Sequence, residues 1–438
     1  MLPLTVSHFV VHWDTVSTDT HILPPHFRWN FAAFLTDYVC FSVAFTFVSF
    51  STVMPALVGQ LTSSAPVIGL VGAIFNGGWL LPQLAVAQLV NDKPYKKPYM
   101  LIGLTGRVTL WAIALGLWAG LARRPTAMLT LFFVCIGLFA VTDGLASVAW
   151  FDILARAIPL RRRGRLVGMS QFISGLIGIG VGALVGLTLE QRPFPDNYAL
   201  LFTLAGLTLV PSVIALALIK EPPPQQNDSP TTGSSRDWWL KILTNDSTFR
   251  RLILCRILVG MLGLASSFYV VHAANALHLP SSIIGGFVVA QTTTGIIASP
   301  VLGWISERWG PHHVARLTGA ASLIGPLFAL LAHLAGDGWL VRAYPIVYVA
   351  LGFVNNAVMP GFMNYMLEIA PEGMCPAYIG LGNTILGVLT LVPMVGGWLL
   401  EATSYTTLFG VTSAFVLIGF LLSLSLKRPQ QALPQAPS

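Results

Sequence analysis

Apolar residues occupy most of this chain in long blocks, and polar residues are confined to short stretches between them. The two longest blocks without Asp, Glu, Lys or Arg, 38–91 and 257–306, are each long enough for two spanning helices of roughly 20 residues. Because backbone groups in hydrocarbon must hydrogen-bond internally, the blocks are predicted to be helices. The pattern predicts twelve spans, at 30–56, 66–90, 99–121, 126–150, 166–189, 197–219, 251–274, 282–305, 314–335, 343–366, 377–400 and 404–426.

Composition agrees with this pattern, because 55% of the 438 residues are hydrophobic and only 9% are charged. Soluble domains carry about 25% charged residues, so this chain is expected in a lipid bilayer. The 24 Lys and Arg exceed the 17 Asp and Glu, which in a soluble protein would suggest nucleic acid. Here the charges lie in loops between apolar blocks, so we interpret them as orientation signals and expect no nucleic acid partner.

The basic residues also predict the orientation in the membrane. With the N-terminus in the cytoplasm, Lys and Arg on the cytoplasmic side outnumber those on the opposite side by eighteen to four. Since basic loops stay on the cytoplasmic side, both termini are expected there, in a multi-pass protein of the cell membrane. The predicted parts are a tail (1–29), a six-helix half (30–220), a linker with a short interfacial helix (221–250), a second six-helix half (251–426) and a tail (427–438).

One polar turn occurs twice, about half a chain apart. The sequence from Gly303 to His313 is GWISERWGPHH, and the sequence from Gln88 to Pro98 is QLVNDKPYKKP. Asp92-Lys93 in the first copy matches Glu307-Arg308 in the second, whereas only the second copy keeps both glycines, Gly303 and Gly310. Each copy follows an apolar block, so the two halves are predicted to be structural repeats.

This repeated turn resembles the loop between helices 2 and 3, and again between helices 8 and 9, of bacterial-type transporters of the major facilitator superfamily. The resemblance extends over about 30–426 and implies an all-α membrane protein with twelve transmembrane helices in two pseudo-symmetric six-helix bundles. It further implies a substrate site between the bundles near mid-membrane. Such a protein would work by alternating access, and we expect it to act as a monomer.

The acids of the two turns are predicted to form a cytoplasmic gate. Each carboxylate can bind the positive N-terminal end of a helix in the other half: Asp92 at the helix that starts near Pro376, and Glu307 at the helix that starts near Arg165. The alternative is that these charges only fix topology, but topology requires the bases and not the acids. Further residues assigned to this gate are Lys93, Lys96, Lys97, Gly303, Arg308, Gly310, Asp152 and Arg156.

Three charged residues inside predicted spans are candidates for proton coupling, because ionisable groups at that depth are costly. Arg107 and Asp143 both lie about 10–12 Å inside the cytoplasmic face, so they are able to pair. The pair is either a structural salt bridge or a coupling device, in which Asp143 takes up a proton when Arg107 turns away. Asp37 is a second candidate, but its position near the cytoplasmic end favours a hydrated role or a helix-start role as the alternatives.

Polar residues in the middle of spans are candidates for the substrate cavity. Hydrogen bonding between helices is the other use of such residues, and it is the commoner one. The candidates are Ser42, Thr46, Asn76, Tyr269, Gln291, Asn356 and Asn383.

The sequence thus predicts a secondary transporter for a small solute, with proton coupling or facilitative uniport both open. Cys40, Cys135, Cys255 and Cys375 form no close-spaced set, so no metal site is expected, and no cofactor motif occurs. A phosphate-binding loop is missing, which argues against a primary pump. No cluster of His and acidic residues stands out, so we expect no enzyme. A drug or metabolite exporter remains an alternative, although the Gly-Pro-x-x-Gly-Gly motif of proton-coupled drug exporters is absent from the predicted fifth span. A non-transporting receptor and a membrane-embedded enzyme are the alternatives from other classes.

Overall fold

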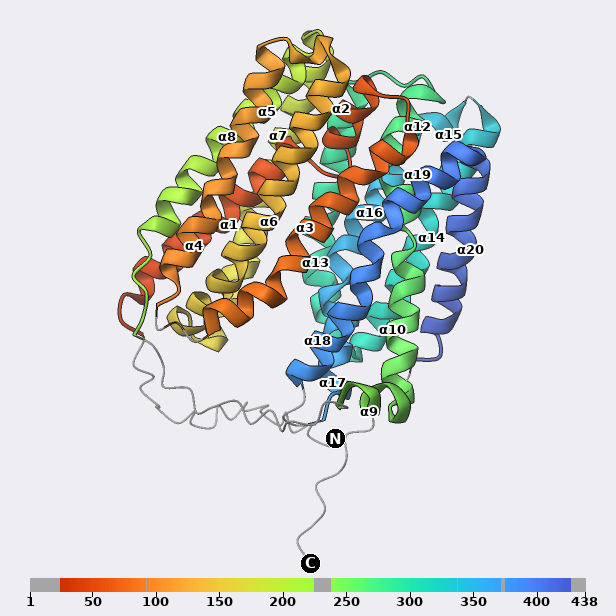
Figure 1. Ribbon diagram of the computed structural model, residues 1–438. Coiled ribbons are helices and arrows are strands. Elements are labelled where there is room, and N and C mark those ends of the chain that lie inside the picture. Colours follow the sequence, from red (N-terminus) through yellow and green to blue (C-terminus); the bar gives the residue numbers. More distant parts are fainter. Residues whose placement is uncertain are drawn as a thin grey trace, which may run out of the picture.

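The computed structural model describes residues 24–91, 93, 95–223, 238–336, 338–371 and 375–426. These residues are largely helical and contain no β-strand, which confirms the predicted all-α class. The helices form two bundles that stand side by side, one from α1 to α8 and the other from α10 to α20 (Figure 1). Residues 1–23 of the predicted N-terminal tail, residues 224–237 of the predicted linker and the whole predicted C-terminal tail lie outside the described residues.

The first bundle contains the first six predicted spans. Its third span consists of two α-helices joined by the 3-10 turn η1, and its first span is followed by the short helix α2. The elements are α1 (Phe27–Phe47), α2 (Val53–Leu61), α3 (Ala65–Asn91), α4 (Lys97–Leu104), η1 (Thr105–Val108), α5 (Thr109–Trp118), η2 (Leu121–Arg123), α6 (Pro125–Ala157), α7 (Leu160–Gln191) and α8 (Asp196–Ala217).

The second bundle is interrupted more often. Its first span is broken into α10, α11 and α12, and its fourth span contains the π-helical turn η3. The elements are α9 (Trp238–Asn245), α10 (Ser247–Gly260), α11 (Gly263–Ser266), α12 (Tyr269–Asn275), α13 (Ile283–Trp309), α14 (Pro311–Ala335), α15 (Trp339–Arg342), α16 (Ile346–Ala357), η3 (Met359–Met363), α17 (Asn364–Ile369), α18 (Cys375–Leu386), η4 (Gly387–Leu391), α19 (Val392–Ala402) and α20 (Tyr405–Ser423).

The number of membrane spans agrees with the sequence prediction. Eleven helical units in the described part are long and apolar enough to cross a bilayer, and Ala65–Trp79 of α3 is a shorter twelfth. The prediction of one continuous span over 30–56 was wrong, because the chain leaves the helix at Val48 and α2 starts at Val53. The Ser49 hydroxyl accepts a hydrogen bond from the backbone N–H of Ser51 at 3.3 Å, so a side chain here competes with the helical backbone bonds.

Apolar side chains fill the interior of each bundle and also cover its outside. Phe132 and Phe202 are fully buried in the first bundle, and Tyr344 and Tyr348 in the second. Large apolar side chains such as that of Leu334, which is 65% exposed, lie on the outer surface. An apolar outer surface is the one expected of helices that face lipid.

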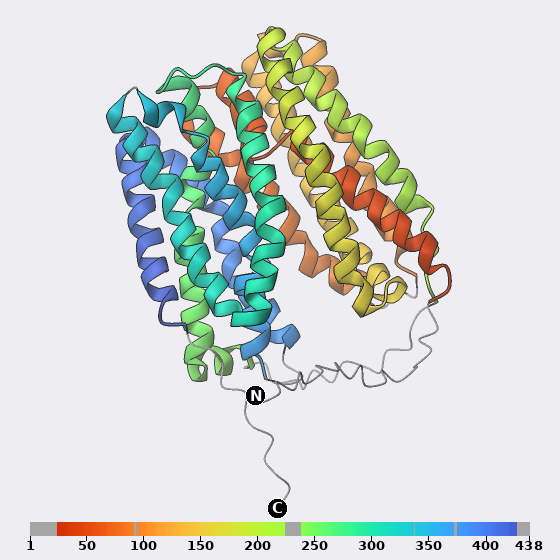
Figure 2. The same cartoon turned by 180° about the vertical axis from the view of Figure 1, so that it is seen from behind.

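The two bundles touch toward one end and diverge toward the other (Figures 1 and 2). We call the end where α2, α12 and α15 lie the outer end, and the end where α1 begins and α20 ends the inner end (Figures 1 and 2). The antiparallel helices α7 and α13 meet near the outer end, where the Ser281 hydroxyl donates to the Leu189 carbonyl oxygen at 3.2 Å. Their backbones approach closely at Gly285, where a Cβ would collide with the backbone of Gly182 and Gly186.

Toward the inner end, α7 and α13 separate. Among the described residues, the polar contact between these helices that lies nearest the inner end is a hydrogen bond. The Ser299 hydroxyl donates it to Gln171 Oε1 at 3.1 Å. One turn further on, a Cβ added at Gly168 of α7 or at Gly303 of α13 would meet no atom within 4 Å. The bundles are therefore closed against each other at the outer end and open at the inner end, as the splayed ribbons of Figure 2 also show.

Candidate functional site

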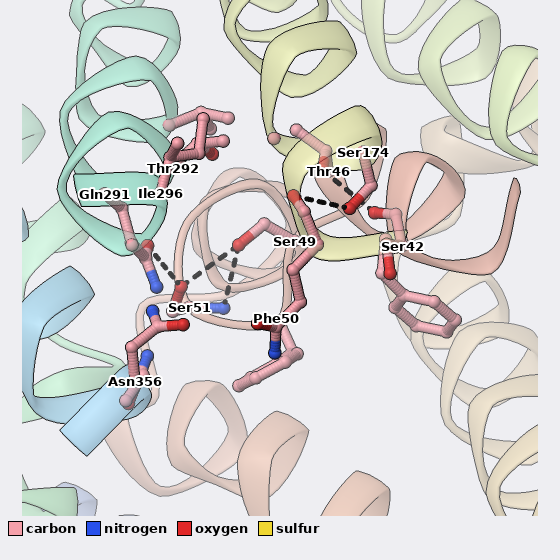
Figure 3. A pocket seen from close by; sticks show the side chains of 16 residues that line it. Ser42, Thr46, Ser49, Phe50, Ser51, Ser174, Gln291, Thr292, Ile296 and Asn356 are labelled. Atoms are coloured by element: carbon pink, nitrogen blue, oxygen red, sulfur yellow. Dashed lines mark hydrogen bonds between the residues drawn. The ribbon is translucent and has the colours of Figure 1, made fainter. Parts of the chain in front are cut away.

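A cavity of about 280 Å³ lies between the two bundles, below their outer contact. Both bundles contribute to its wall, through α1 and α7 on one side and α13 and α16 on the other (Figure 3). Among the described residues, no charged side chain lines it. The polar lining residues are Ser42, Thr46, Ser49, Ser51, Gln171, Ser174, Gln291, Thr292, Asn355 and Asn356.

Besides the bond from Ser299 to Gln171, a hydrogen bond between two wall residues joins the bundles across this cavity. The Ser51 hydroxyl, in the segment between α1 and α2, donates to Gln291 Oε1 of α13 at 3.2 Å (Figure 3). Ser51 also pairs with the Ser49 hydroxyl at 3.0 Å. The helix break after α1 therefore places the hydroxyl groups of Ser49 and Ser51 at the wall of the cavity. In a continuous helix these side chains would point in other directions.

Several polar groups of the wall are already bonded within their own helix. Thr46 Oγ1 donates to the Ser42 carbonyl oxygen at 2.9 Å, and Asn356 Nδ2 donates to the Gly352 carbonyl oxygen at 2.8 Å. A hydroxyl that donates its only hydrogen still has lone pairs, and an amide that donates through nitrogen still has its oxygen. The wall thus retains acceptor oxygens at Thr46 and Asn356.

A second hollow, of about 360 Å³, adjoins the first and shares Ser42 with it. It lies within the first bundle and contains a buried ionic cluster. Arg107 donates to Asp37 Oδ1 from Nη1 at 3.3 Å and from Nη2 at 3.2 Å. Trp150 Nε1 donates to Asp37 Oδ2 at 2.8 Å, and the Ser212 hydroxyl bonds to both Arg107 and Asp37. Helices α1, η1, α6 and α8 therefore hold Asp37 and Arg107 in one geometry.

Asp143 is the third member of the cluster and is held less closely. Its Oδ1 lies 4.0 Å from Arg107 Nη2, and its side chain is hydrogen-bonded by Trp79. The Arg107 guanidinium also lies 5.4 Å from the centre of the Phe41 ring. Two carboxylates thus face one guanidinium, so the cluster carries one acid more than its cation can balance.

The three predicted proton-coupling residues are therefore neighbours in space. The expected pair of Arg107 with Asp143 is the longer contact, and Asp37 is the nearer partner of Arg107. Of the alternatives for Asp37, the helix-start role was wrong, since α1 begins at Phe27. The hydrated role stays a hypothesis, because Asp37 is 4% exposed and has three partners but also lines the second hollow. Sequence reasoning missed Ser212 and Trp150, because the sequence has no signal that pairs residues 113 to 175 positions apart.

The predicted cavity residues divide into three groups. Ser42, Thr46, Gln291 and Asn356 line the central cavity. Asn76 of α3 and Asn383 of α18 are exposed but are not part of its wall. The assignment of Tyr269 was wrong, because its ring is fully buried inside the second bundle and stacks on Phe409 with the ring centres 5.6 Å apart.

The described gate residues of the first half form an ionic network inside their own bundle. Lys96 Nζ lies 3.1 Å from Asp152 Oδ1, and Arg156 Nη2 lies 2.7 Å from Asp152 Oδ2. Arg156 also contacts Glu221 Oε1 at 2.6 Å, and the Glu221 carboxylate accepts the backbone N–H groups of Lys96 and Lys97. Sequence reasoning missed Glu221, which lies at the start of the predicted linker.

The predicted contacts between the halves are not formed by the described gate residues. Lys93, Glu307 and Arg308 are exposed, and Glu307 has no ion pair within the described part of the chain. Asp92 and the side chain of Pro376 lie outside the described residues. Gly310 has φ 95°, a conformation that residues with a Cβ rarely adopt, so the second glycine of the turn is required for the connection from α13 to α14.

Known proteins resemble this chain both in sequence and in fold. The sequence profile of the Major Facilitator Superfamily matches residues 38–392. Multidrug resistance protein MdtL of Vibrio parahaemolyticus is 24% identical over 265 residues, covering 58% of this chain and 62% of the relative. Multidrug resistance protein 1 of Bacillus subtilis is 25% identical over 183 residues, covering 41% of this chain and 45% of the relative. The matches thus span less than two thirds of the length of these relatives.

Solved structures share the fold over nearly the whole chain. A bacterial homologue of the iron transporter ferroportin in its inward-facing state has a TM-score of 0.68 at 16% identity, covering 91% of this chain and 98% of that one. The same kind of homologue in its outward-facing state has a TM-score of 0.59 at 15% identity, covering 91% and 99%. Nucleoside transporter NupG has a TM-score of 0.62 at 12% identity, covering 92% and 100%. At these identities the likeness concerns the fold alone.

Proposed function

This chain belongs to the Major Facilitator Superfamily, and we propose that it is a secondary transporter that moves a small, uncharged solute by alternating access. The observation that carries the proposal is the central cavity, whose wall is shared by two bundles that touch at one end and separate at the other. A site between two such bundles is exposed to one side at a time when they rock against each other. By the distribution of basic residues, the open inner end is the cytoplasmic one and both termini lie in the cytoplasm of a cell-membrane protein.

The wall of the cavity supports an uncharged solute. Burying an ion without a partner is costly, and the described wall offers hydroxyls and amides but no charge. Phe45 and Phe50 add aromatic surface on which a ring of the solute can stack. The volume of about 280 Å³ is at the lower end of ordinary small-molecule sites, which favours a small solute over an extended one.

Protons are the coupling ion that the buried cluster supports. Asp37 and Asp143 share the single cation Arg107, so uptake of one proton balances the cluster. Because the hollow that holds the cluster shares Ser42 with the central cavity, a solute in the cavity is within reach of it. Facilitative uniport is the alternative, in which the cluster has a structural role only.

A drug or metabolite exporter is the second candidate. The hollow beside the cluster is lined by Phe41, Phe75, Trp79 and Trp150, which is a surface suited to apolar, ring-bearing molecules. Two relatives are named multidrug resistance proteins, which agrees with this candidate. In an exporter the solute would occupy the hollow beside the ionic cluster, whereas in a transporter of small uncharged solutes it would occupy the central cavity.

Transport by purified protein in vesicles tests the proposal. Protein would first be screened by thermal shift with nucleosides, mono- and disaccharides, polyols and lipophilic cations, and each hit followed as radiolabelled counterflow. We expect a hit among the uncharged solutes, with counterflow reduced at least about tenfold by Gln291→Leu and unchanged by Gln191→Leu at the exposed end of α7. Flux only of lipophilic cations would favour the exporter, and binding without flux would point to a receptor on the same fold. Chemical conversion of a bound solute would point to an enzyme.

A further inference from the structure

Two histidines form a buried pair at the outer end of the second bundle, away from the cavity and the ionic cluster. His272 Nε2 of α12 lies 3.1 Å from His333 Nδ1 of α14. His272 Nδ1 lies 3.0 Å from the hydroxyl of Tyr344, which itself donates to the Tyr269 carbonyl oxygen at 3.1 Å. The His272 side chain is fully buried, whereas that of His333 is half-buried.

The hydrogens of this chain of contacts can be assigned from its geometry. Tyr344 has one hydroxyl hydrogen and gives it to the Tyr269 carbonyl, so His272 Nδ1 must donate to the Tyr344 oxygen. A neutral imidazole that donates through Nδ1 accepts through Nε2, so His333 Nδ1 is the donor between the two rings. His333 Nε2 is then the nitrogen that is left to take up a proton.

This assignment limits the pair to one extra proton. A proton on His333 Nε2 keeps the bond between the rings and makes it charge-assisted. A second proton must go to His272 Nε2, which places two N–H groups and two positive charges face to face across the 3.1 Å contact. The doubly protonated pair therefore cannot keep this arrangement.

No acid among the described neighbours compensates a second charge. The titratable groups around the pair are Tyr344, which follows α15, Tyr405 of α20, whose ring centre lies 4.7 Å from that of His272, and Tyr269 of α12. The Phe409 ring, whose centre lies 5.0 Å from that of His272, completes an apolar and aromatic surrounding.

The pair is attached to a segment of the outer closure. Helix α12 is the last piece of a broken span, separated from α11 by Ser267 and Phe268. A Cβ added at Gly59 of α2 would lie 3.5 Å from Val271 Cγ2 of α12, so α12 closes against the first bundle at this point. The neighbouring residue, His272, binds α12 to the rest of the second bundle.

We propose that His272 and His333 form a proton-binding site, and that its second proton releases α12 and opens the outer closure. The inference rests on the alternating access proposed above, and it is separate from proton coupling at Asp143. Acid on the outer side would reach the site through half-buried His333. The site thereby favours the outward-open arrangement at low outer pH.

Spin labels across the outer closure test this site. Labels on Gln60→Cys and Asn275→Cys, two exposed residues of α2 and α12, report the distance between the bundles in full-length protein whose four native cysteines are replaced by serine. Between pH 8 and pH 5 we expect the open population to rise about fivefold or more. In His272→Gln and in His333→Gln the pH dependence should be lost.

A neighbouring histidine provides the control. His278 is exposed and has φ 51°, a conformation that Asn tolerates, so His278→Asn should keep the full pH dependence. Should His272→Gln fail to fold, His333→Gln decides alone, because His333 is half-buried. A pH-independent distance in the parent protein, or an unchanged pH response in the folded histidine variants, would overturn the proposal. Solute flux in vesicles is measured separately. Flux that continues while the outer distance ignores pH rejects the histidine site but keeps the proposed transport function.

Discussion

Arg107 Nη2 lies 3.2 Å from Asp37 Oδ1 in the interior of the first bundle, although 70 positions separate the two residues in the chain. Ser212 and Trp150 hold the same carboxylate, so Asp37 has three partners. The Asp143 carboxylate lies 4.0 Å from the same Arg107 nitrogen, so its contact with the cation is the weaker one. Of the two acids, Asp143 is therefore the one whose proton can exchange without dismantling the cluster.

Replacing Asp143 by asparagine should uncouple transport from the proton gradient. The amide of the Asp143→Asn variant has no charge to titrate, so accumulation driven by a pH gradient should be abolished while exchange of solute continues. The measurement is solute uptake in vesicles with a pH-sensitive dye inside, with and without a gradient. Glu190→Gln, at an exposed position of α7, is the matched control and should behave as the parent. Undiminished accumulation in Asp143→Asn would leave the cluster a structural role only.

Replacing Asp37 and Arg107 singly and together should show strong coupling between them. Asp37→Asn leaves the guanidinium without its nearest acid, and Arg107→Gln leaves a buried carboxylate without its cation. The double variant removes both charges. Its loss in free energy of unfolding should therefore be smaller than the sum of the two single losses, by about 1–3 kcal/mol. Thermal or denaturant unfolding in detergent measures the three losses. Additive losses would contradict the pairing.

Two adjacent glycines offer a test of the outer closure. A Cβ at Gly285 would collide with the backbone of Gly182 and Gly186, whereas a Cβ at Gly286 would meet nothing within 4 Å. Gly285→Val should therefore hold α7 and α13 apart, reduce transport by at least about tenfold and favour the outward-open state. Gly286→Val is the control and should transport normally. Equal effects of the two substitutions would speak against a close contact at this position.

The arrangement of spans could be predicted because long apolar blocks and the repeated turn are visible in one sequence. The break after α1 could not, because Ser49 and Ser51 look like ordinary polar positions until their side chains bond to each other and to the backbone. Tyr269 was misplaced for a related reason: hydropathy shows that it lies in a span but does not show which side of a broken helix faces the cavity.

The site was predictable in part. The depth of Arg107 and Asp143 in their spans predicted that they are neighbours, since it depends only on helix rise. The nearer position of Asp37, and the pairing of His272 with His333, depend on how helices pack in three dimensions. Neither has a spacing in the sequence that would reveal it.

The repeated polar turn leads to a prediction about a gate at the inner end. Glu307 is exposed and unpaired among the described residues in this inner-open structure, as expected if its contact with the other half forms only when the inner end closes. Glu307→Gln, like Asp92→Asn, should shift the population toward the inner-open state. Labelling of single cysteines at both mouths measures this shift, and Glu401→Gln, at the exposed end of α19, is the control. Unaltered labelling at both mouths would count against the gate.

The most direct test of the account measures both mouths in the same protein. Spin labels at Gly168→Cys and Gly303→Cys report the inner mouth, where both positions have open space, and labels at Gln60→Cys and Asn275→Cys report the outer one. Across a series of pH values and solutes in lipid nanodiscs, we predict that the inner distance shortens whenever the outer distance lengthens. Two distances that stay fixed, or that lengthen and shorten together, would contradict alternating access in this protein.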